Sequence, residues 1–545
     1  MTSAIFFIFM TSLLLCMALI QPLRLLAGRF QIMMDQPGER KVHQSPIPKV
    51  GGIAFGVAAF ASILWWAPKD ESTIALLLGG AIILGFGLWD DRVNLNYRIK
   101  LLGQILAAFA VTTVGGIRFE SIPFLTTADL PMWIGVPVTV FFLVAASNAI
   151  NLSDGLDGLA GGLSFLTLCG IGYLAYLSDN QTVLLLTIPF LGGLLGFLRY
   201  NTYPARIFMG DSGSQLLGLT MGILVILLTD STRGPYSPAL SLFLLGLPFL
   251  DTLGVAGQRL AEGHSPFTGD RKHFHHKLIT AGLTHYEAVT VIYLIQGGMV
   301  GLAFLLQWRS DLLVLSIYLI LACTVLALFI AAGQGLIAHP APRAVLIRSN
   351  EWLSTILNGP LLCDVPIRFL AVVVPLFLIG SVFLPSYVSD DVSYISIALF
   401  GAVLFGLTIL PRLAPYFVRG GLYIGSTFLL YASDATWMQA MAPIPMTYHV
   451  LFGALALMVL LCMRFDRQNR FQTTPLDYLM VCLAVLFPFL PEVSTDISSL
   501  GLFAAKLIVL FLSFELLMQE FANRIKQLGL VSLWILLGLA VRGWL

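Results

Sequence analysis

Long apolar runs dominate the pattern of hydrophobic and polar positions along this chain. About eighteen of them approach the roughly 20 residues that a helix needs to cross the hydrocarbon core of a membrane. The first group lies at about 4–26, 51–67, 73–89, 99–115, 133–149, 162–178, 183–199, 213–229, 238–256, 287–306 and 311–332. The second lies at about 366–384, 391–410, 418–433, 445–463, 476–491, 500–519 and 527–543, and the run at 418–433 is short enough for a re-entrant segment. The pattern predicts an all-α polytopic integral membrane protein.

A stretch interrupted by glycine and proline, 333–365, separates the two groups of runs. It predicts a first block, 1–332, with about 11 helices, an interrupted cytoplasmic linker, and a second block, 366–545, with about 7 helices. No internal repeat relates the blocks, which weakens the interpretation as an inverted-repeat transporter. The role of the second block stays open.

The lysine and arginine residues between the runs set the predicted orientation. Loops on the cytoplasmic side carry an excess of these residues. With the N-terminus outside, the inside loops of the first block hold many of them, whereas the outside loops of the same region hold only Lys69, Arg118, Arg233 and Arg309. The charge pattern therefore predicts that every polar cluster described below faces the cytoplasm.

Composition agrees with this class and excludes others. The chain has 58% hydrophobic and 11% charged residues, against roughly 25% charged residues in soluble domains. A net charge of +1 leaves no concentrated basic face for a nucleic acid. The six cysteines are scattered, without the paired spacing of a metal site or a disulfide framework.

Five polar clusters at the ends of the runs carry the candidate chemistry, because ionisable groups beside membrane segments are costly and usually functional. The first is DQPGERKVHQSPIPKVGG at 35–52, where Arg40, Lys41, His43 and Lys49 lie in a loop that suits a phosphate. Ordinary anchoring by cytoplasmic positive charge is the alternative.

The second cluster is the adjacent pair Asp90 and Asp91 after the run ILGFGLW. Neighbouring carboxylates at a membrane boundary repel each other and lose hydration unless they share a cation or a proton, and a metal site is the favoured interpretation. A solvated helix end is the alternative.

The third cluster is SNAINLSDGLDGLAGG at 147–162, which lacks the basic residues expected of an inside loop. Asn148, Asn151, Asp154 and Asp157 recur every third residue and would share one face of a helical turn. The glycines between them let the backbone approach a ligand closely. A simple acidic turn is the alternative.

The fourth cluster is NTYPARIFMGDSGSQLLG at 201–218, where Asp211 begins an apolar helix. Arg206 and the free amides of the helix start add anion-binding character beside this acid. A carboxylate that only caps the helix is the alternative.

The fifth cluster is RLAEGHSPFTGDRKHFHHKL at 259–278, which contains Arg271, His273, His275 and His276. These donors suit the phosphates of a nucleotide-sugar. A zinc site and a solvated basic loop are the alternatives. Together, the five clusters combine hard oxygen ligands with basic phosphate clamps, as phosphoryl-type transfer requires.

The segments RKVHQSPIPKVGG, NAINLSDGLDGLAGG, NTYPARIFMGDSGS and SPFTGDRKHFHHKL, with the Asp-Asp pair, resemble in order the polyprenyl-phosphate N-acetylhexosamine-1-phosphate transferases, over about 1–330. The resemblance implies that undecaprenyl phosphate attacks the sugar-side phosphorus of a UDP-N-acetylhexosamine, with N-acetylglucosamine as the favoured sugar, and that UMP leaves. It implies Mg²⁺ as cofactor, with Mn²⁺ as the alternative.

The resemblance also assigns roles to the candidate residues. It implies Asp211, Asn151 and Asp91 at the metal and Asp90 on the lipid phosphate, as base or nucleophile. It implies nucleotide-sugar contacts for Asp154, Asp157, Arg206, Arg271, His273, His275 and His276. The lipid phosphate is expected at Arg40, Lys41, His43 and Lys49.

The first loop and the HFHH cluster are similar to the branch that starts O-antigen, teichoic-acid and other surface glycans in the bacterial inner membrane. The branch that transfers phospho-N-acetylmuramoyl-pentapeptide for peptidoglycan is one alternative, and a lipid or sugar transporter is another. A transporter would place its ionisable residues near the bilayer midplane, not at helix ends. A homodimer is left open.

Overall fold

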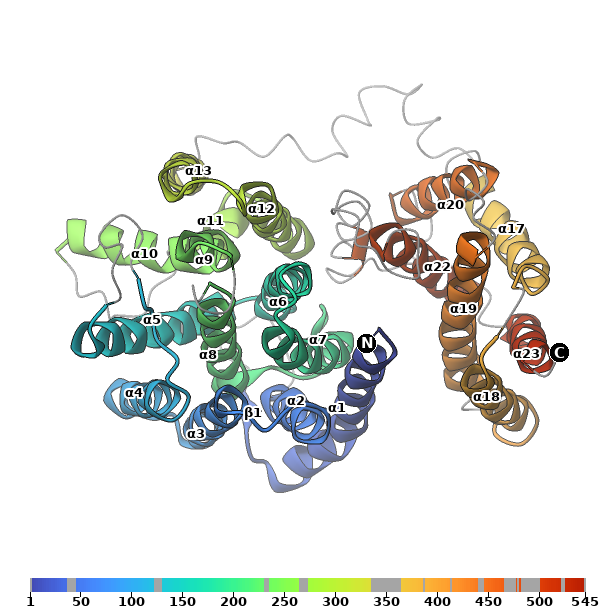
Figure 1. Cartoon of the computed structure of the whole chain (residues 1–545), viewed down its shortest axis with the longest axis horizontal. Coiled ribbons are helices and arrows are strands. Elements are labelled where there is room, and N and C mark those ends of the chain that lie inside the picture. The colour runs from blue at the N-terminus through green and yellow to red at the C-terminus, as the bar shows by residue number, and fades with distance from the viewer. Residues whose placement is uncertain are drawn as a thin grey trace. The chain divides into compact units, whose positions relative to one another are not determined.

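The computed structural model of the chain describes residues 2–36, 46–121, 130–229, 235–263, 273–334, 364–385, 388–411, 414–439, 446–464, 477, 480–481, 500–520 and 525–543. Most of these residues lie in helices (Figure 1), which confirms the all-α class. Twelve described helices are long and apolar enough to cross a membrane, or up to 13 spans if one bent pair counts as a span. The predicted run at 476–491 lies almost wholly outside the described residues.

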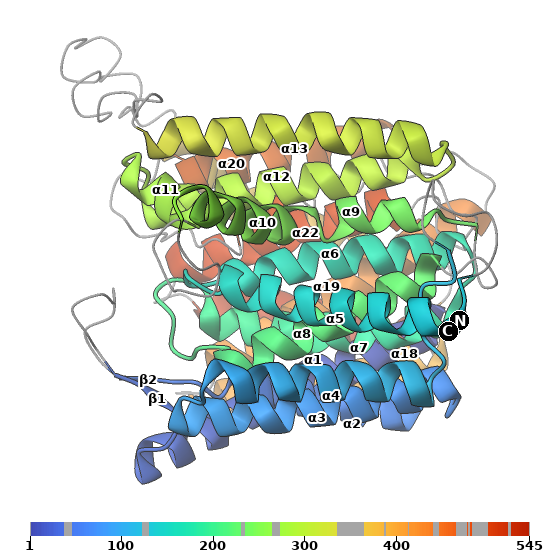
Figure 2. The ribbon, with the colours of Figure 1, turned by 90° about the vertical axis from the view of Figure 1, so that its left-hand side faces the viewer.

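The chain forms two compact units. The first consists of Met1–His339 with Thr474–Leu479, and the second of Pro340–Thr473 with Met480–Leu545. The long helices of the first unit run alongside one another (Figure 2), each within one predicted apolar run or overlapping it. They are α1 (Thr2–Phe30), α2 (Gly51–Trp66), α3 (Glu71–Val93), α4 (Tyr97–Val114), α5 (Met132–Ser153), α6 (Leu159–Leu177), α7 (Gln181–Asn201), α8 (Gly210–Thr229), α12 (His285–Leu306) and α13 (Asp311–Gly333).

Helix α8 forms the centre of the first unit. Its candidate membrane span is 100% buried, and a helix that is apolar on all sides needs such surroundings. It packs on α2, α3, α5 and α6. Glycines permit the close crossings: a Cβ on Gly52 of α2 would lie 2.4 Å from the backbone nitrogen of Gly213, and one on Gly218 would lie 2.5 Å from the carbonyl oxygen of Ala146. These contacts fix the N-terminus of α8 between α2, α3 and α5.

The predicted run at 238–256 does not form one straight helix. It is divided between a short segment, η1 (Pro238–Leu240) with α9 (Ser241–Leu244), and α10 (Gly246–Ala261), which are bent by 80°. Leu245 at the break has φ −101° and ψ 15°, outside helical geometry. Gly246 and Pro248 follow it, and both residue types weaken a helix interior. The bend turns α10 against α5 and α12.

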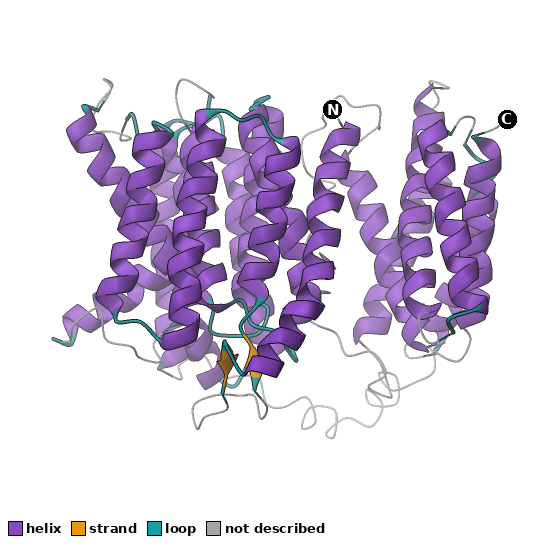
Figure 3. Ribbon diagram, turned by 90° about the horizontal axis from the view of Figure 1, so that it is seen from below, coloured by secondary structure: helices purple, strands orange, loops and turns teal. Residues whose placement is uncertain are grey.

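A pair of very short antiparallel strands, β1 (Met34–Asp35) and β2 (Ile47–Pro48), lies at one end of the first unit (Figure 3). The segment before α8 pairs with this region: the Phe208 amide donates to the Pro48 carbonyl over 2.9 Å, and the Gly51 amide donates to the Phe208 carbonyl over 2.9 Å. The loop that begins α2 is thereby held against the start of α8.

The second unit contains α17 (Val365–Ser381), α18 (Asp390–Thr408), α19 (Ala414–Gln439), α20 (Met446–Arg464), α22 (Leu500–Glu520) and α23 (Ile525–Arg542). The run at 418–433 lies within α19, a continuous helix of 26 residues, so it is not a re-entrant segment. Two charged pairs join α19 to α22. Lys506 Nζ lies 2.9 Å from Asp434 Oδ2 with side chains 2% and 1% exposed, and Arg419 Nε lies 2.9 Å from Glu515 Oε1.

Candidate active site

Three of the predicted clusters meet at one end of the first unit. Asp90 and Asp91 lie in the last turn of α3, Asn151 lies in the last turn of α5, and Asp211 lies in the first turn of α8. The acids therefore occupy helix ends. The transporter alternative would instead place them near the middle of the bilayer.

Asp91 holds the beginning of α8. Its Oδ1 accepts a hydrogen bond from the Asp211 amide over 2.9 Å, and its Oδ2 accepts one from the Ser212 amide over 3.1 Å. Free amides at a helix N-terminus favour a carboxylate for this reason. Gly210 has φ +74°, and a Cβ there would lie 2.5 Å from Asp91 Oδ2. The carboxylate of Asp91 thus sets the position of Asp211, and its role as a metal ligand stays a prediction.

Lys100 joins the other two acids. Its Nζ lies 2.5 Å from Asp90 Oδ2 and 2.8 Å from Asp211 Oδ2. Asp90 is 2% exposed, and its Oδ1 also accepts a hydrogen bond from the Leu95 amide over 2.6 Å. One ammonium group therefore bridges two carboxylates and reduces the repulsion between them.

In the sequence, Lys100 is one of the basic residues that the charge pattern predicts on the cytoplasmic side, and no role in the site was predicted for it. A signal was present in the short segment between the predicted runs at 73–89 and 99–115. In the structure, Asn94 with φ +51° and the helix cap Asn96 connect α3 to α4 through a very short turn. Such a turn makes neighbouring helices antiparallel. The first turn of α4 then lies opposite the last turn of α3, beside Asp90.

Asn151 holds the other oxygen of Asp211. Its Nδ2 donates to Asp211 Oδ1 over 3.0 Å and to Ser214 Oγ over 2.9 Å. Behind it, Gln104 Nε2 donates to Asn148 Oδ1 and to Gln215 Oε1, each over 3.2 Å. This amide layer connects α4, α5 and α8, so both oxygens of Asp211 are held in place before any substrate arrives.

The loop between α5 and α6 is attached to two other elements. Asp157 Oδ2 accepts a hydrogen bond from the Ala205 amide over 2.9 Å, and the Gly158 amide donates to Asn201 Oδ1 over 3.1 Å. Tyr293 of α12 donates from its hydroxyl to the Gly158 carbonyl over 2.6 Å. These hydrogen bonds hold the loop in one conformation, although its sequence shows only that it is rich in glycine and acidic residues.

Asp154 lies in this loop on the side of the acidic centre. Desolvation, followed by the negative charges of Asp211, Asp91 and Asp157, raises the pKa of its carboxyl to about 7. Lys49 opposes the rise with its positive charge. The second, third and fourth clusters of the sequence thus share one electrostatic environment, as a site for a cation requires.

His275 closes the same loop from the side of α11 (Phe274–Thr280). A Cβ on Gly155 would lie 2.2 Å from His275 Nε2, so the imidazole lies directly on the glycine. The ring is 3% exposed, and burial, together with the charges of His276, His273 and His285, lowers its pKa to about 3. His275 is therefore neutral at physiological pH and supplies no positive charge to a phosphate.

His285 is a second residue that the sequence analysis missed. Its ring lies 4.5 Å from the ring of Tyr203, centroid to centroid, and its Nε2 lies 3.2 Å from the Asp157 carbonyl oxygen. The pair connects the start of α12 to the loops on either side of the acidic centre. An isolated histidine at a helix start gives little sequence signal for such a role.

Comparisons with known proteins agree with this geometry. The family model described as "Glycosyl transferase family 4" matches residues 73–229. The chain is 35% identical over 306 residues to a "Probable undecaprenyl-phosphate N-acetylglucosaminyl 1-phosphate transferase" of Bacillus subtilis, covering 56% of this chain and 85% of the relative. This chain belongs to glycosyl transferase family 4.

Other relatives point the same way. An "Undecaprenyl-phosphate alpha-N-acetylglucosaminyl 1-phosphate transferase" of Yersinia pestis is 32% identical, covering 51% of this chain and 79% of the relative. A "Decaprenyl-phosphate N-acetylglucosaminephosphotransferase" of Mycolicibacterium smegmatis is 34% identical, covering 50% of this chain and 74% of the relative. The predicted family is confirmed, and this family 4 protein is about twice as long as the region that it shares with these relatives.

The matched region of this family 4 protein contains the acidic centre. Residues 73–229 extend from α3 to the end of α8 and include Asp90, Lys100, Asn151 and Asp211. The histidine cluster and the second unit lie beyond it. The part of the chain that carries the family's signal is therefore the part that brings the carboxylates together.

The donor set of the family 4 site fits a hard divalent cation. Within the described residues no group of three or more His, Cys, Asp or Glu side chains is arranged to hold a metal. Mg²⁺ needs less than this, because it keeps several waters and binds through one or two carboxylates plus substrate phosphates. Asp90, Asp211 and Asn151 supply hard oxygen donors of this kind, and Lys100 binds both carboxylates in the structure.

The remaining basic residues predicted for this family 4 site fall into two groups: some lie outside the described residues, and two are described at loops near the acidic centre. Arg40, Lys41, His43 and Arg271 lie outside the described residues. Lys49 pairs with Asp35, Nζ to Oδ1, over 3.6 Å. Arg206 is exposed in the loop before α8, with its amide bonded to the Tyr200 carbonyl over 2.8 Å.

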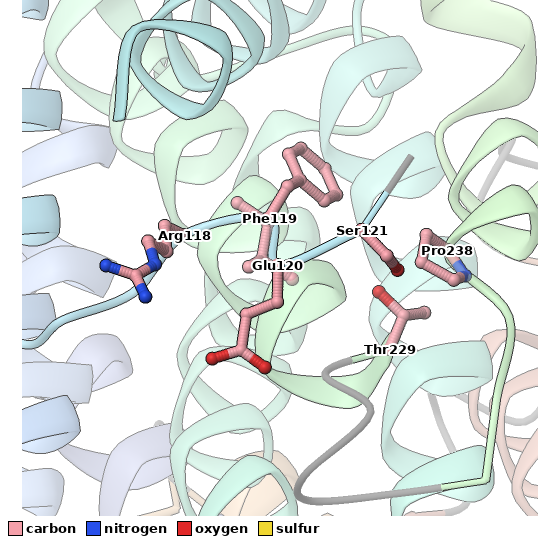
Figure 4. A pocket seen from close by; sticks show the side chains of 7 residues that line it. Arg118, Phe119, Glu120, Ser121, Thr229 and Pro238 are labelled. Atoms are coloured by element: carbon pink, nitrogen blue, oxygen red, sulfur yellow. The ribbon is translucent and has the colours of Figure 1, made fainter. Parts of the chain in front are cut away.

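Figure 4 shows a small pocket of this family 4 protein. It is lined by Arg118, Glu120 and Ser121 from the α4–α5 connection and by Thr229 at the end of α8. Asp211 lies in the first turn of the same helix, and a helix of 20 residues is about 30 Å long. The pocket therefore belongs to the opposite end of the bundle.

Proposed function

We propose that this protein transfers N-acetylglucosamine 1-phosphate from its UDP-sugar to undecaprenyl phosphate and releases UMP. The observation that carries the proposal is the contact of Lys100 with both Asp90 and Asp211 within the family-matched region. The names of the relatives supply the sugar and the lipid class.

The reaction exchanges one phosphorus–oxygen bond for another. An oxygen of the lipid phosphate forms a bond to the phosphorus that carries the sugar, and the bond from that phosphorus to the bridging oxygen breaks. The bridging oxygen leaves with UMP and its electron pair. Positioning and charge stabilisation are what a protein contributes to such a transfer.

The acidic centre supplies both contributions. Asp90 takes up a proton from the incoming lipid phosphate, and Lys100 beside it balances the negative charge that gathers during the transfer. Asn151 and Asp91 hold Asp211 from two sides. A covalent intermediate on Asp90 is the alternative, and protein that carries the sugar 1-phosphate, formed with release of UMP in a mixture without the lipid acceptor, would favour it.

Asp211, with Asn151 and Asp91, would hold Mg²⁺, or Mn²⁺ as the alternative cation. When bound, the cation neutralises the diphosphate of the donor and orients it. The hard oxygen donors at the end of α3 and the start of α8 support this choice over zinc.

The remaining predicted contacts surround this centre. We propose that the nucleotide-sugar is contacted by Asp154, Asp157, Arg206, Arg271, His273, His275 and His276. The uncharged ring of His275 packs on Gly155. For the lipid phosphate we propose Arg40, Lys41, His43 and Lys49. The attachment of β2 to the segment before α8 supports a lipid-phosphate site beside the acids.

We propose that the acidic centre faces the cytoplasmic side of the bacterial inner membrane, because the lysine and arginine residues gather in the loops at that end of the helices. UDP-sugars are made in the cytosol, on the same side. The reaction would be the first membrane step of a surface polysaccharide of the O-antigen, teichoic-acid or exopolysaccharide kind. A homodimer is compatible with this role.

The test is UMP release by the purified protein with undecaprenyl phosphate, Mg²⁺ and a panel of UDP-sugars. We expect release with UDP-N-acetylglucosamine and formation of the lipid-linked sugar diphosphate. Release only with UDP-N-acetylmuramoyl-pentapeptide would favour the peptidoglycan branch. No release with any donor, from protein that is folded by its thermal unfolding transition, would reject the enzyme and leave the transporter alternative.

A further inference from the structure

A buried carboxylate outside the acidic centre contacts the histidine cluster. Asp251 of α10 is 5% exposed, and its Oδ2 lies 3.0 Å from His273 Nδ1. Its Oδ1 accepts a hydrogen bond from the Phe274 amide over 2.9 Å. Both side chains of the Asp251–His273 pair are 7% exposed. Neither the family's acidic motifs nor the proposed reaction assigns a role to Asp251.

The bend before α10 creates this contact. Because α10 is turned by 80° from the preceding segment, Asp251 lies beside the start of α11. A charged side chain at this depth needs partners that satisfy both oxygens. The first amide of α11 satisfies one oxygen, and the imidazole of His273 satisfies the other.

The contact with Asp251 determines which ring nitrogen of His273 is available to a ligand. An ionised carboxylate only accepts hydrogen bonds, so Nδ1 of His273 carries the proton. Nε2 is then the ring nitrogen that remains for a ligand. The Asp251 contact also fixes the plane of the ring, because one hydrogen bond and a buried environment leave little freedom of rotation.

The position of His273 relates it to the proposed donor site. Its ring is parallel to that of His275, with centroids 6.0 Å apart and an interplanar angle of 6°. His275 in turn lies on Gly155, next to Asp154 in the α5–α6 loop. The two rings therefore form a stack beside the loop that faces the acidic centre.

We propose that Asp251 is a positioning residue, which fixes the tautomer and the orientation of His273 so that Nε2 meets the phosphate or sugar of the nucleotide-sugar. This inference rests on the proposed function. Carboxylates that orient metal-ligating histidines in this way are worth about 10- to 100-fold in metal affinity or activity, and we expect an effect of this size here. A carboxylate that only caps α11 would act through Oδ1 alone.

Two substitutions separate these roles. Asp251→Asn keeps an oxygen that can accept from the Phe274 amide, but its amide group donates to Nδ1 and imposes the opposite tautomer. Asp251→Ala removes both contacts. We expect Asp251→Asn to lower the rate of UMP release about 10- to 100-fold, with the thermal unfolding temperature close to that of the parent, and Asp251→Ala to lower both. Asp179→Asn, at an exposed carboxylate with φ +53° that asparagine tolerates, is the matched control.

A double-substitution cycle shows whether Asp251 acts through its histidine. In protein that carries His273→Gln, the further change Asp251→Asn should have no additional effect on UMP release. Multiplied losses in the double variant would overturn the proposal, because they would show that Asp251 acts elsewhere.

Nitrogen-15 NMR of histidine-labelled protein in lipid reads the tautomer without any turnover. We expect one histidine to change from the Nδ1–H to the Nε2–H form in Asp251→Asn, and His273→Gln to remove that signal. An unchanged tautomer would overturn the inference even if activity falls. A parent protein that shows the Nδ1–H form but releases no UMP would reject the proposed function instead.

Discussion

Lys100 Nζ and Asp211 Oδ2 lie 2.8 Å apart, although 111 positions separate the two residues in the chain. The ion pair joins the first turn of α4 to the first turn of α8, and Asp90 shares the same ammonium group. The contact converts three helix ends into one charged centre. Substitutions at this centre and at the residues around it should change UMP release and thermal unfolding.

Lys100→Met should lower UMP release at least about 100-fold, because charge stabilisation by a single group in a transfer site has this weight. It should also lower the thermal unfolding temperature, since the repulsion between Asp90 and Asp211 is no longer compensated. Arg98→Met is the control, because Arg98 lies in the same turn of α4 but its side chain is exposed and donates to the hydroxyl of its neighbour Tyr97. Equal activity of both variants would remove Lys100 from the centre.

Asp211→Asn should abolish UMP release while expression and unfolding temperature stay near those of the parent, because the amide cannot replace the charge of a metal carboxylate. Treatment of the parent with EDTA should abolish release as well, and Mg²⁺ should restore it. Activity that survives EDTA, or a near-normal rate of Asp211→Asn, would contradict the metal assignment. Zn²⁺ at the same concentration should not restore the rate.

Gly210→Ala should destabilise the protein by at least about 1–2 kcal/mol, because a Cβ is strained at φ +74°. The new methyl group would also displace the Asp91 carboxylate, which lies within 2.5 Å of its position. Gly85→Ala in α3 is the control, because a Cβ there meets no atom within 4 Å. Chemical or thermal denaturation measures the difference. A loss of stability in Gly85→Ala as large as in Gly210→Ala would argue against the close contact at Asp91.

The buried imidazole of His275 should make stability depend on pH. Its pKa falls from 6.5 to about 3 on folding, so its contribution to stability is complete above pH 6.5 and is lost progressively as the pH falls toward 3. Linkage gives a loss on the order of 2 kcal/mol at pH 5 relative to pH 7. His275→Phe keeps a ring of similar size without the titration, so its unfolding temperature should fall less between pH 7 and pH 5. Parallel pH profiles of the two proteins would count against a neutral, buried His275.

The pair of Lys506 and Asp434 in the second unit should be sensitive to the loss of one partner. Lys506→Met leaves the Asp434 charge buried at 1% exposure, and such a change costs about 3–5 kcal/mol. The double variant Lys506→Met with Asp434→Leu should recover much of this loss, because two apolar side chains can fill the same space. Additive losses in the double variant, measured by thermal unfolding, would show that the pair does not act as a unit.

The apolar runs predicted most of the helices because hydrophobic length is a local property of the chain. The runs at 51–67 and 311–332 correspond closely to α2 and α13, and the composition of each run is sufficient to identify it. The run at 238–256 shows the limit of this reasoning. Its hydropathy says nothing about the bend of 80° at Leu245, and Gly246 and Pro248 weaken the helix there without fixing the angle at which α10 meets α5 and α12.

The sequence by itself determined which segments of the chain are apolar enough to form membrane helices, and it determined the inventory of acids, amides and histidines at their ends, because both are read from residue type and spacing. Only the tertiary structure decided which of these groups meet. Asp90 and Asp91 are neighbours in the chain, yet one pairs with Lys100 and the other holds the amides of α8. The division follows from the packing of α3, α4 and α8, since a contact between distant residues depends on the whole fold.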